Sequence, residues 1–157
     1  MSSEVRKPEY AHLTDSGMDI FALEEITIAP GETKLIHTGI KLAIPNGYEV
    51  QIRPKSGRCL KTKLRIANTP ATIDAGYRGE ICVIVENVDP PIRAIHPSGK
   101  IITIGDIEFG QSYTIGKGEK FAQLVLCEIP KMILIPVGTV EGIGTDRNGG
   151  FGSTGLK

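Results

Sequence analysis

The chain of 157 residues is long enough for one domain with a substantial hydrophobic core. Its 18 Lys and Arg residues balance 18 Asp and Glu residues, so the formal net charge is zero. This argues against nucleic acid as a partner, because domains that bind nucleic acid usually carry a basic excess. The 19 Gly and 10 Pro residues, with short runs of Val, Ile and Thr, favour an all-β fold with many turns over a helical one.

The apolar segments and the cysteines predict a cytoplasmic protein with no membrane partner. Residues 1–10 are polar and charged and lack the apolar centre of a signal peptide. The longest apolar run, Met132–Val137, is far too short to cross a bilayer. Cys59, Cys82 and Cys127 form no Cys-x-x-Cys pair, so we expect free thiols in a reducing compartment.

The first third of the chain consists of short strand signals separated by turns. A turn runs into an apolar strand within Leu13–Ala22. Further strands are expected at Glu25–Ile28, Thr33–Ile36, Gly39–Ile44 and Tyr48–Ile52. Pro30-Gly31 joins the first two of these, and Pro45-Asn46-Gly47 joins the last two as a hairpin, since Asn-Gly is typical of tight β-turns. Short strands at this spacing indicate a sandwich or barrel.

The middle of the chain interrupts the β pattern and then resumes it. Arg53–Gly57 is a basic loop that carries a hydroxyl group, and one short helix is expected over Arg58–Lys63. Ile81–Val85 is apolar enough to form a central strand.

A β-hairpin is expected over Thr69–Ile81, with Gly76 and Gly79 supplying the positive φ of a tight reversal. Its polar tip also holds Asp74, Tyr77 and Arg78. A carboxylate, an aromatic ring and a cation on a stiff turn suit a small ligand. An ordinary hairpin turn is the alternative for this stretch taken alone.

The last third combines an insertion, two strands and a glycine-rich end. Turn signals crowd residues 89–110, where Lys100–Ile104 is expected to form one strand of an inserted surface hairpin. Strands follow at Lys120–Leu126 and Met132–Val137. Residues 142–157 are so rich in glycine that we expect a mobile C-terminal segment after a β domain of residues 1–141.

Two polar features within the predicted β domain are candidates for contacts with a ligand or a metal ion. Gln123 is an amide inside an otherwise apolar strand, so it either satisfies a neighbouring loop or faces a ligand. Asp15 and Asp19 either hold magnesium through water or serve as a turn cap and a surface carboxylate.

The glycine-rich end offers a guanidinium, a ring and two hydroxyls, from Arg147, Phe151, Ser153 and Thr154. These groups suit phosphate oxygens and a flat base, because arginine grips phosphate in a fork and glycine lets the backbone approach. A disordered tail is the alternative. A Walker-type loop is excluded, since no Gly-Lys-Ser/Thr follows a strand and opens a helix.

Five segments, in order, resemble the motifs of the homotrimeric dUTP pyrophosphatases (dUTPases). They are Asp15–Ile20, Pro54–Gly57, Asn68–Gly79, Gly118–Leu124 and Arg147–Gly155. Together they span nearly the entire chain, and five motifs in sequence are far more specific than any one. The resemblance implies an all-β, jelly-roll-like distorted β-barrel with at most one short helix. It also implies a homotrimer in which the C-terminal arm extends to a neighbouring subunit.

The resemblance implies hydrolysis of dUTP to dUMP and pyrophosphate, which limits uracil in DNA and supplies a dTMP precursor. Asp74 would hold the 3′-hydroxyl and orient the attacking water as general base toward the α-phosphorus. Gln123 would bind an α-phosphate oxygen or the water. Ser56 would meet the oxygen that bridges the α- and β-phosphates. Asp19 would support a Mg²⁺ cofactor indirectly, through water.

The same resemblance assigns the nucleotide contacts. Asn68 would contact the uracil edge, and Tyr77 would pack under deoxyribose and exclude a 2′-hydroxyl. The tail would close as a lid, with Phe151 stacked on uracil and the γ-phosphate held by the residues Arg147, Ser153 and Thr154. The remaining expected substrate-binding residues are Lys55, Gly57, Ile73, Arg78 and Gly152.

Three features depart from the family pattern. Lys55 stands where arginine is usual, so a bidentate grip on phosphate becomes a point charge, for which Arg53 or Arg58 are candidates to compensate. The spacing from Arg147 to Phe151 is one residue shorter than usual. The segment at residues 89–110 is longer than in compact members.

Two other functions stay open at this point. One is a dCTP deaminase on the same fold, which would need an added carboxylate near the base. The other is a non-catalytic nucleotide-sensing or partner-binding module.

Overall fold

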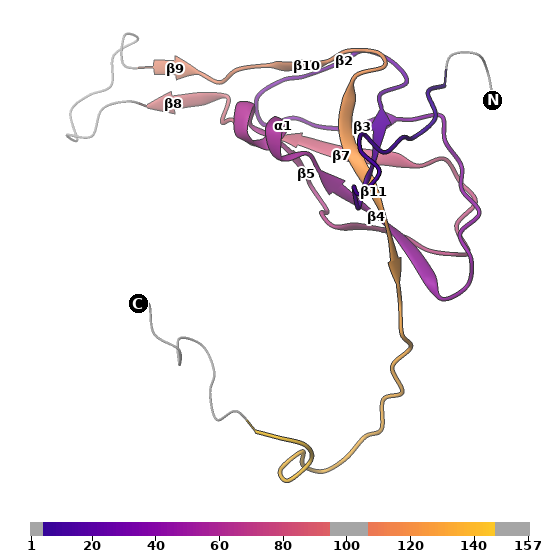
Figure 1. Ribbon diagram of the computed structural model, residues 1–157. Coiled ribbons are helices and arrows are strands. Elements are labelled where there is room, and N and C mark those ends of the chain that lie inside the picture. The colour runs from indigo at the N-terminus through magenta and orange to yellow at the C-terminus, as the bar shows by residue number, and fades with distance from the viewer. Residues whose placement is uncertain (1–4, 95–106, 147–157) are drawn as a thin grey trace.

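The computed structural model describes residues 5–94 and 107–146, and these form short strands and one short helix (Figure 1). The strands are β1 (Met18–Phe21), β2 (Ile26–Ile28), β3 (Thr33–His37), β4 (Tyr48–Pro54), β5 (Leu64–Ile66), β6 (Ala71–Ile73), β7 (Cys82–Asn87), β8 (Ile92–Ala94), β9 (Ile107–Phe109), β10 (Tyr113–Ile115) and β11 (Lys120–Glu128). Helix α1 spans Ser56–Lys61, two residues earlier than the sequence predicts. None of the described helical residues forms a segment long and apolar enough to cross a membrane.

The strands form two main antiparallel sheets and two ribbons. One sheet has the order β1-β11-β4-β6 and the other β3-β7-β5, while β10 pairs with β2 and β8 with β9. Strands adjacent in a sheet are mostly distant in sequence, as in jelly-roll folds. The sheets do not close into a continuous barrel, but the predicted jelly-roll-like all-β class is confirmed.

The hydrophobic core draws on the inner faces of both main sheets. In β4, Val50 and Ile52 are buried while Gln51 and Arg53 are not, the alternation expected of a strand with one buried face. Isoleucine dominates this core, and burying each such side chain stabilises the fold by about 1.5–3 kcal/mol. The predicted central strand at Ile81–Val85 is confirmed as β7, which lies between β3 and β5.

The predicted hairpin over Gly39–Ile52 is wrong in its first half. Its turn is present, because the Tyr48 N–H donates to the Pro45 carbonyl at 3.2 Å and Gly47 has a φ of 88°. Residues 39–44, however, form no strand. Ile40 is buried, and its carbonyl accepts a hydrogen bond from the Ile81 N–H at 2.8 Å. This segment is therefore held by the buried Ile40 side chain and an isolated backbone hydrogen bond, and not by a ladder of β-sheet hydrogen bonds.

The predicted β-hairpin over Thr69–Ile81 is also wrong. Its first flank, β6, pairs with β4, whereas the strand that follows its second flank, β7, pairs with β3 and β5. The polar tip is therefore a loop that crosses from one sheet to the other. Neither Gly76 nor Gly79 has a positive φ, and the loop turns through a hydrogen bond from the Tyr77 N–H to the Asp74 carbonyl at 3.0 Å.

The predicted insertion at residues 89–110 has a paired stem. Strands β8 and β9 pair antiparallel and project from the body (Figure 1). The buried Asn87 fixes the base of this stem, since its Nδ2 donates to the Ile28 carbonyl at 3.2 Å and to the Gln111 carbonyl at 2.8 Å. The predicted strand Lys100–Ile104 lies outside the described residues.

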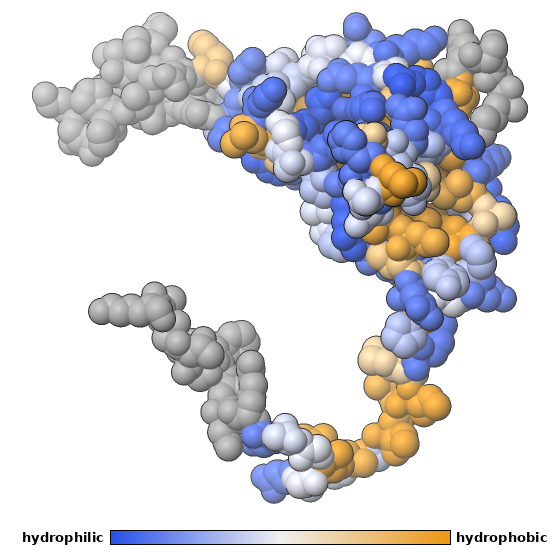
Figure 2. All heavy atoms as spheres, viewed as in Figure 1, coloured by the Kyte–Doolittle hydropathy of each residue, from blue (hydrophilic) through white to orange (hydrophobic). Residues whose placement is uncertain are grey.

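After β11 the chain leaves the body as an arm, residues 129–146 (Figure 1). The predicted strand Met132–Val137 is wrong, because these residues pair with nothing in the described chain. Pro130 and Pro136 also lack the N–H that a ladder requires. The apolar side chains of the arm face solvent, with Ile133 87% exposed (Figure 2). The predicted division into residues 1–141 and 142–157 stays a prediction.

Candidate active site

Three polar side chains lie in register across the four-stranded sheet. Asp19 on β1 pairs with Gln123 on β11, and Gln123 pairs with Arg53 on β4. Residues directly opposite each other on antiparallel strands project from the same face of the sheet. Two residues predicted from separate motifs, Asp19 and Gln123, are therefore side by side, although 104 positions separate them in the sequence (123 − 19).

Asp19 is buried and holds two ammonium groups. One carboxylate oxygen, Oδ1, pairs with Lys55 Nζ, and the other, Oδ2, lies 3.0 Å from Lys120 Nζ. Burial alone would raise the pKa of Asp19, but the hydrogen bonds and charges of the two lysines outweigh it and hold this pKa below its usual value. Asp19 therefore stays ionised and fixes Lys55 and Lys120 beside the polar row.

Gln123 fits its position because residue 17 is glycine. The Nε2 of Gln123 donates to the Pro54 carbonyl at 3.2 Å, so this amide satisfies a neighbouring strand end, one of the two roles expected of it. A Cβ at position 17 would lie 3.1 Å from Gln123 Cδ and closer still to Oε1. Gly17 thus leaves the space that the amide occupies.

Helix α1 and the start of β11 border an open, cationic pocket of about 320 Å³. Its lining residues are Lys55, Gly57, Arg58, Lys61, Thr62, Glu119 and Lys120. Ser56, the first residue of α1, follows Lys55 at this pocket and is exposed. Four cations line the pocket against the carboxylate of Glu119, while Asp19 and Glu9, outside this lining, pair with two of the lysines. The small positive excess that remains suits a polyanion such as a chain of phosphates.

Of the two arginines expected to compensate for Lys55, the structure places only Arg58 in this pocket. Arg58 pairs with Glu119 and donates to the Lys120 carbonyl at 3.4 Å. Arg53 instead donates to Gln51 Oε1 at 3.0 and 2.7 Å. Reasoning from the sequence did not single out Glu119 and Lys120 as site residues, although both lie within the fourth motif segment, Gly118–Leu124.

The loop after β6 carries the predicted nucleoside contacts. Asp74 and Tyr77 are exposed, and the Tyr77 hydroxyl donates to the Glu80 carbonyl at 2.9 Å. Arg78 braces the loop, because its Nη1 donates to the carbonyls of Ala75 and Tyr77 at 2.5 and 2.8 Å. Ile73 ends β6, and the exposed Asn68 lies in the turn between β5 and β6.

Within a single chain, Asp74 and the cationic pocket lie toward opposite ends of β4. Ile73 pairs with Val50, so Asp74 continues along β4 toward Glu49. Pro54 is at the opposite end of that strand, and Lys55, which lines the pocket, follows it. Glu49 and Pro54 are five positions apart (54 − 49), which at about 3.4 Å per residue is about 17 Å. The structure thus gathers Asp19, Lys55 and Gln123 but not Asp74.

The predicted tail residues lie outside the described part of the chain. They are Arg147, Phe151, Gly152, Ser153 and Thr154.

Comparison with known proteins identifies the family. The family model described as dUTPase matches residues 3–104. The deoxyuridine 5'-triphosphate nucleotidohydrolase of Alkaliphilus metalliredigens is 44% identical over 151 residues, 96% of this chain and 90% of the relative.

Two solved structures agree with this assignment. The dUTPase of Staphylococcus bacteriophage 80alpha, solved with dUPNHPP, has a TM-score of 0.80 at 33% identity and covers 99% of this chain and 95% of its own. A mutant dUTPase from phage phi11 of S. aureus, whose structure describes the coordination of a structural Mg(II) ion, has a TM-score of 0.72 at 33% identity. The match covers 89% of this chain and 94% of the phage chain. The chain belongs to the dUTPase family.

Proposed function

We propose that this chain hydrolyses dUTP at a site to which different subunits contribute, with Asp74 orienting the attacking water. The activity is that of its family: dUTP and water give dUMP and pyrophosphate, which limits uracil in DNA and supplies a dTMP precursor. The observation that carries the proposal for the site is the row of Asp19 and Gln123 beside the cationic pocket. Nothing in the comparisons favours a dCTP deaminase or a non-catalytic module.

In this proposal, the pocket beside α1 receives the phosphates. Lys55, Lys120 and Arg58 supply positive charge, and Ser56 donates a hydrogen bond to the oxygen that bridges the α- and β-phosphates, which favours charge on the departing pyrophosphate. Gln123 contacts an α-phosphate oxygen or the attacking water. A single lysine at position 55 binds phosphate as a point charge, and Arg58 supplies the guanidinium that this position lacks.

The loop from Asp74 to Gly79 receives the nucleoside. Asp74 accepts a hydrogen bond from the water that attacks the α-phosphorus and takes its proton as the phosphorus–oxygen bond to pyrophosphate breaks. Tyr77 packs against deoxyribose, where a 2′-hydroxyl would clash. Asn68, Ile73 and Arg78 complete the proposed nucleoside contacts.

A magnesium ion fits this site only indirectly. Asp19 offers the hard carboxylate oxygens that Mg²⁺ takes, directly or through water. Both oxygens already hold lysine ammonium groups, so direct coordination would break two ion pairs. Contact through the ion's water molecules leaves these pairs in place. When bound, Mg²⁺ would neutralise phosphate charge, and Asp19 would meanwhile keep Lys55 and Lys120 in position.

A homotrimer would bring the separated groups together. Asp74 of one chain lies about 17 Å along β4 from the pocket of the same chain, so a second chain must supply one of the two groups. The exposed apolar arm supports assembly, because side chains such as Ile133 and Leu134, 87% and 84% exposed, favour burial against another chain. In this proposal residues 142–157 close over the bound nucleotide, with the phosphate contacts made by Arg147, Ser153 and Thr154 and the uracil stacked on Phe151 next to Gly152.

Pyrophosphate release from dUTP, UTP, dTTP and dCTP, with and without Mg²⁺, tests this proposal. We expect rapid release from dUTP alone, strongly enhanced by Mg²⁺. Substantial ammonia release from dCTP would instead show a deaminase, and binding of dUTP without turnover would show a sensing module.

A further inference from the structure

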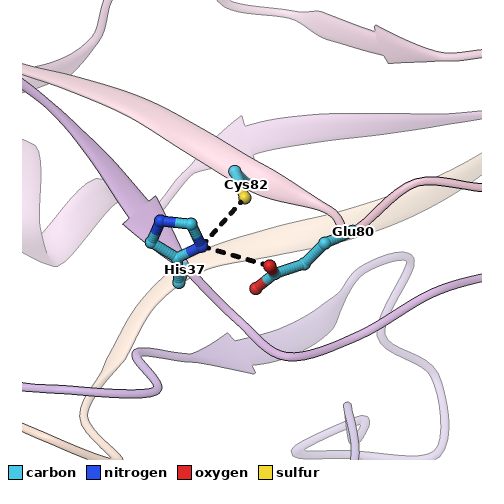
Figure 3. A group of neighbouring side chains, drawn as sticks. All are labelled: His37, Glu80 and Cys82. Carbon is cyan, nitrogen blue, oxygen red and sulfur yellow. Dashed lines mark hydrogen bonds and ion pairs between the residues drawn. The ribbon is translucent and has the colours of Figure 1, made fainter.

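Three metal-ligating side chains converge on the sheet that contains β3 and β7, outside the proposed active site (Figure 3). His37 ends β3 and lies directly opposite Cys82, the first residue of β7. Glu80 precedes Cys82 by two positions, and its carboxylate reaches the same imidazole. His37 Nδ1 lies 3.1 Å from Glu80 Oε2 and 3.4 Å from Cys82 Sγ.

These separations are close to those around a tetrahedral zinc ion. Zinc takes His nitrogen at about 2.0–2.1 Å, carboxylate oxygen at about 2.0–2.2 Å and Cys sulfur at about 2.3 Å, which places such donors about 3.3–3.6 Å apart. The three ligand atoms here all lie within 4.8 Å of one another. Small side-chain rotations would therefore suffice to enclose the ion.

We propose that His37, Glu80 and Cys82 bind a zinc ion, with water in the fourth position. The set of one nitrogen, one oxygen and one sulfur donor favours Zn²⁺ over Mg²⁺, which prefers oxygen alone. The side chains of His37 and Glu80 are 43% and 30% exposed, so an ion and its water have access from solvent.

The carboxylate of Glu80 is already oriented for this role. Its Oε1 accepts the Thr38 N–H at 3.1 Å and the Gly39 N–H at 2.8 Å, which leaves Oε2 directed at His37. Hydrogen bonds of this kind hold a metal ligand in place before the ion arrives. The ladder between β3 and β7 fixes the two other ligands.

A bound ion would also brace the loop that carries Asp74. The Glu80 carbonyl accepts the Tyr77 hydroxyl, so a metal held by the Glu80 side chain restrains the end of that loop. We therefore expect Zn²⁺ to raise the unfolding temperature of the full-length protein. A ligand that binds only the folded state stabilises it, and the effect grows with ligand concentration.

Metal titration of the chelator-treated, full-length protein tests the site. Calorimetry with Zn²⁺ should give one ion per chain, and Co²⁺ in its place should give a thiolate-to-cobalt charge-transfer band in the near ultraviolet. Cys82→Ser should abolish this band and weaken Zn²⁺ binding at least about 100-fold, because loss of a mere supporting contact already costs about 10–100-fold. His37→Gln should weaken it similarly. Cys127→Ser, which removes another half-buried thiol, should change neither measurement.

Two results would overturn the proposal. One is a wild-type protein that binds no Zn²⁺, and the other is a Cys82→Ser protein that binds it as tightly as the wild type. In either case the cluster is a hydrogen bond between His37 and Glu80 with an adjacent thiol. Thermal unfolding of each variant without metal shows that it is folded, and the cobalt band of His37→Gln gives a second readout should Cys82→Ser fail to fold.

Discussion

The ring of Tyr77 lies so close to the backbone of Gly79 that a Cβ at position 79 would be 2.6 Å from Tyr77 Cζ. The Tyr77 hydroxyl is at the same time held by the Glu80 carbonyl at 2.9 Å. The ring is thus fixed between a glycine and a hydrogen bond, and any side chain at position 79 must displace it. Gly79 is required here for space, since its φ is not positive.

Gly79→Ala should weaken discrimination between dUTP and UTP. The added methyl group pushes the Tyr77 ring away from its position, and we propose that this ring excludes the 2′-hydroxyl. The ratio of kcat/KM for dUTP to that for UTP should fall by roughly tenfold or more. The matched control is Gly76→Ala, because a Cβ at position 76 meets nothing within 4 Å. Equal ratios in the two variants would contradict the role of Tyr77.

Gly17→Ala should slow turnover without unfolding the protein. A Cβ at position 17 displaces the Gln123 amide, and moving a positioned group by about 1 Å can cost about 100-fold in rate. We expect kcat for dUTP to fall by about 10–100-fold. Gly116→Ala is the control, since the nearest atom to its added Cβ is 3.6 Å away. An unchanged kcat in Gly17→Ala would remove Gln123 from the proposed mechanism.

Asp19→Asn should make stability less dependent on pH in the acid range. The ion pairs hold the pKa of Asp19 below its value of about 3.9 in the unfolded chain. They therefore stabilise the folded protein above that pH, and this stabilisation is lost as the pH falls through the folded-state pKa. At pH 7 the variant should lose about 1.5–3 kcal/mol of unfolding free energy, the usual contribution of hydrogen bonds to a charged group.

Urea denaturation at fixed protein concentration, from pH 3 to pH 8, measures this effect. The difference between wild type and Asp19→Asn should narrow below about pH 4. Asp15→Asn serves as the comparison, because Asp15 accepts a backbone N–H from His12 and pairs with no lysine among the described residues. A difference that stays constant across the range would show that the two lysines do not stabilise ionised Asp19.

Two truncations separate the roles of the arm. Deletion of residues 147–157 should leave a trimer that binds dUTP but turns it over slowly, since it removes the proposed phosphate and uracil contacts of the lid. Deletion of residues 129–157 also removes exposed apolar side chains such as Ile133, and it should shift the protein toward smaller species in analytical ultracentrifugation. If the protein without residues 129–157 remains fully trimeric, the arm does not hold the assembly together. If the protein without residues 147–157 remains fully active, those residues do not act as a lid.

Strand identity was predictable from the sequence for β4 and β7, where one face of the strand is buried, but not for residues 39–44, where Ile40 and Ile44 are buried without a strand. The alternation around Val50 and Ile52 predicts β4, and the apolar run at Ile81–Val85 predicts β7. Which strands pair with one another in the sheets was not predictable in this way. The two flanks of the Asp74 loop look like a hairpin locally, but each finds its partner in a different sheet. Local patterns report burial, whereas pairing depends on residues far away in the chain.

The same limit applies to the candidate site. Asp19 and Gln123 were predicted as site residues, but their direct pairing depends on the register of β1 and β11. Lys120 lies within the fourth motif but was not singled out as a site residue, because its partner Asp19 is 101 positions away (120 − 19). The apolar run at Met132–Val137 resembles a strand in sequence, yet its backbone finds no partner within the described chain.

Asp74→Asn, measured for dUTP binding and for pyrophosphate release in parallel, tests the role of Asp74 in hydrolysis most directly. The amide keeps the size of the side chain but cannot take the proton of the attacking water. We predict that the affinity for dUTP stays within a few-fold of wild type while pyrophosphate release falls by about 10²–10⁴-fold, the usual contribution of a general base. Turnover equal to that of the wild type would show that Asp74 is not the general base.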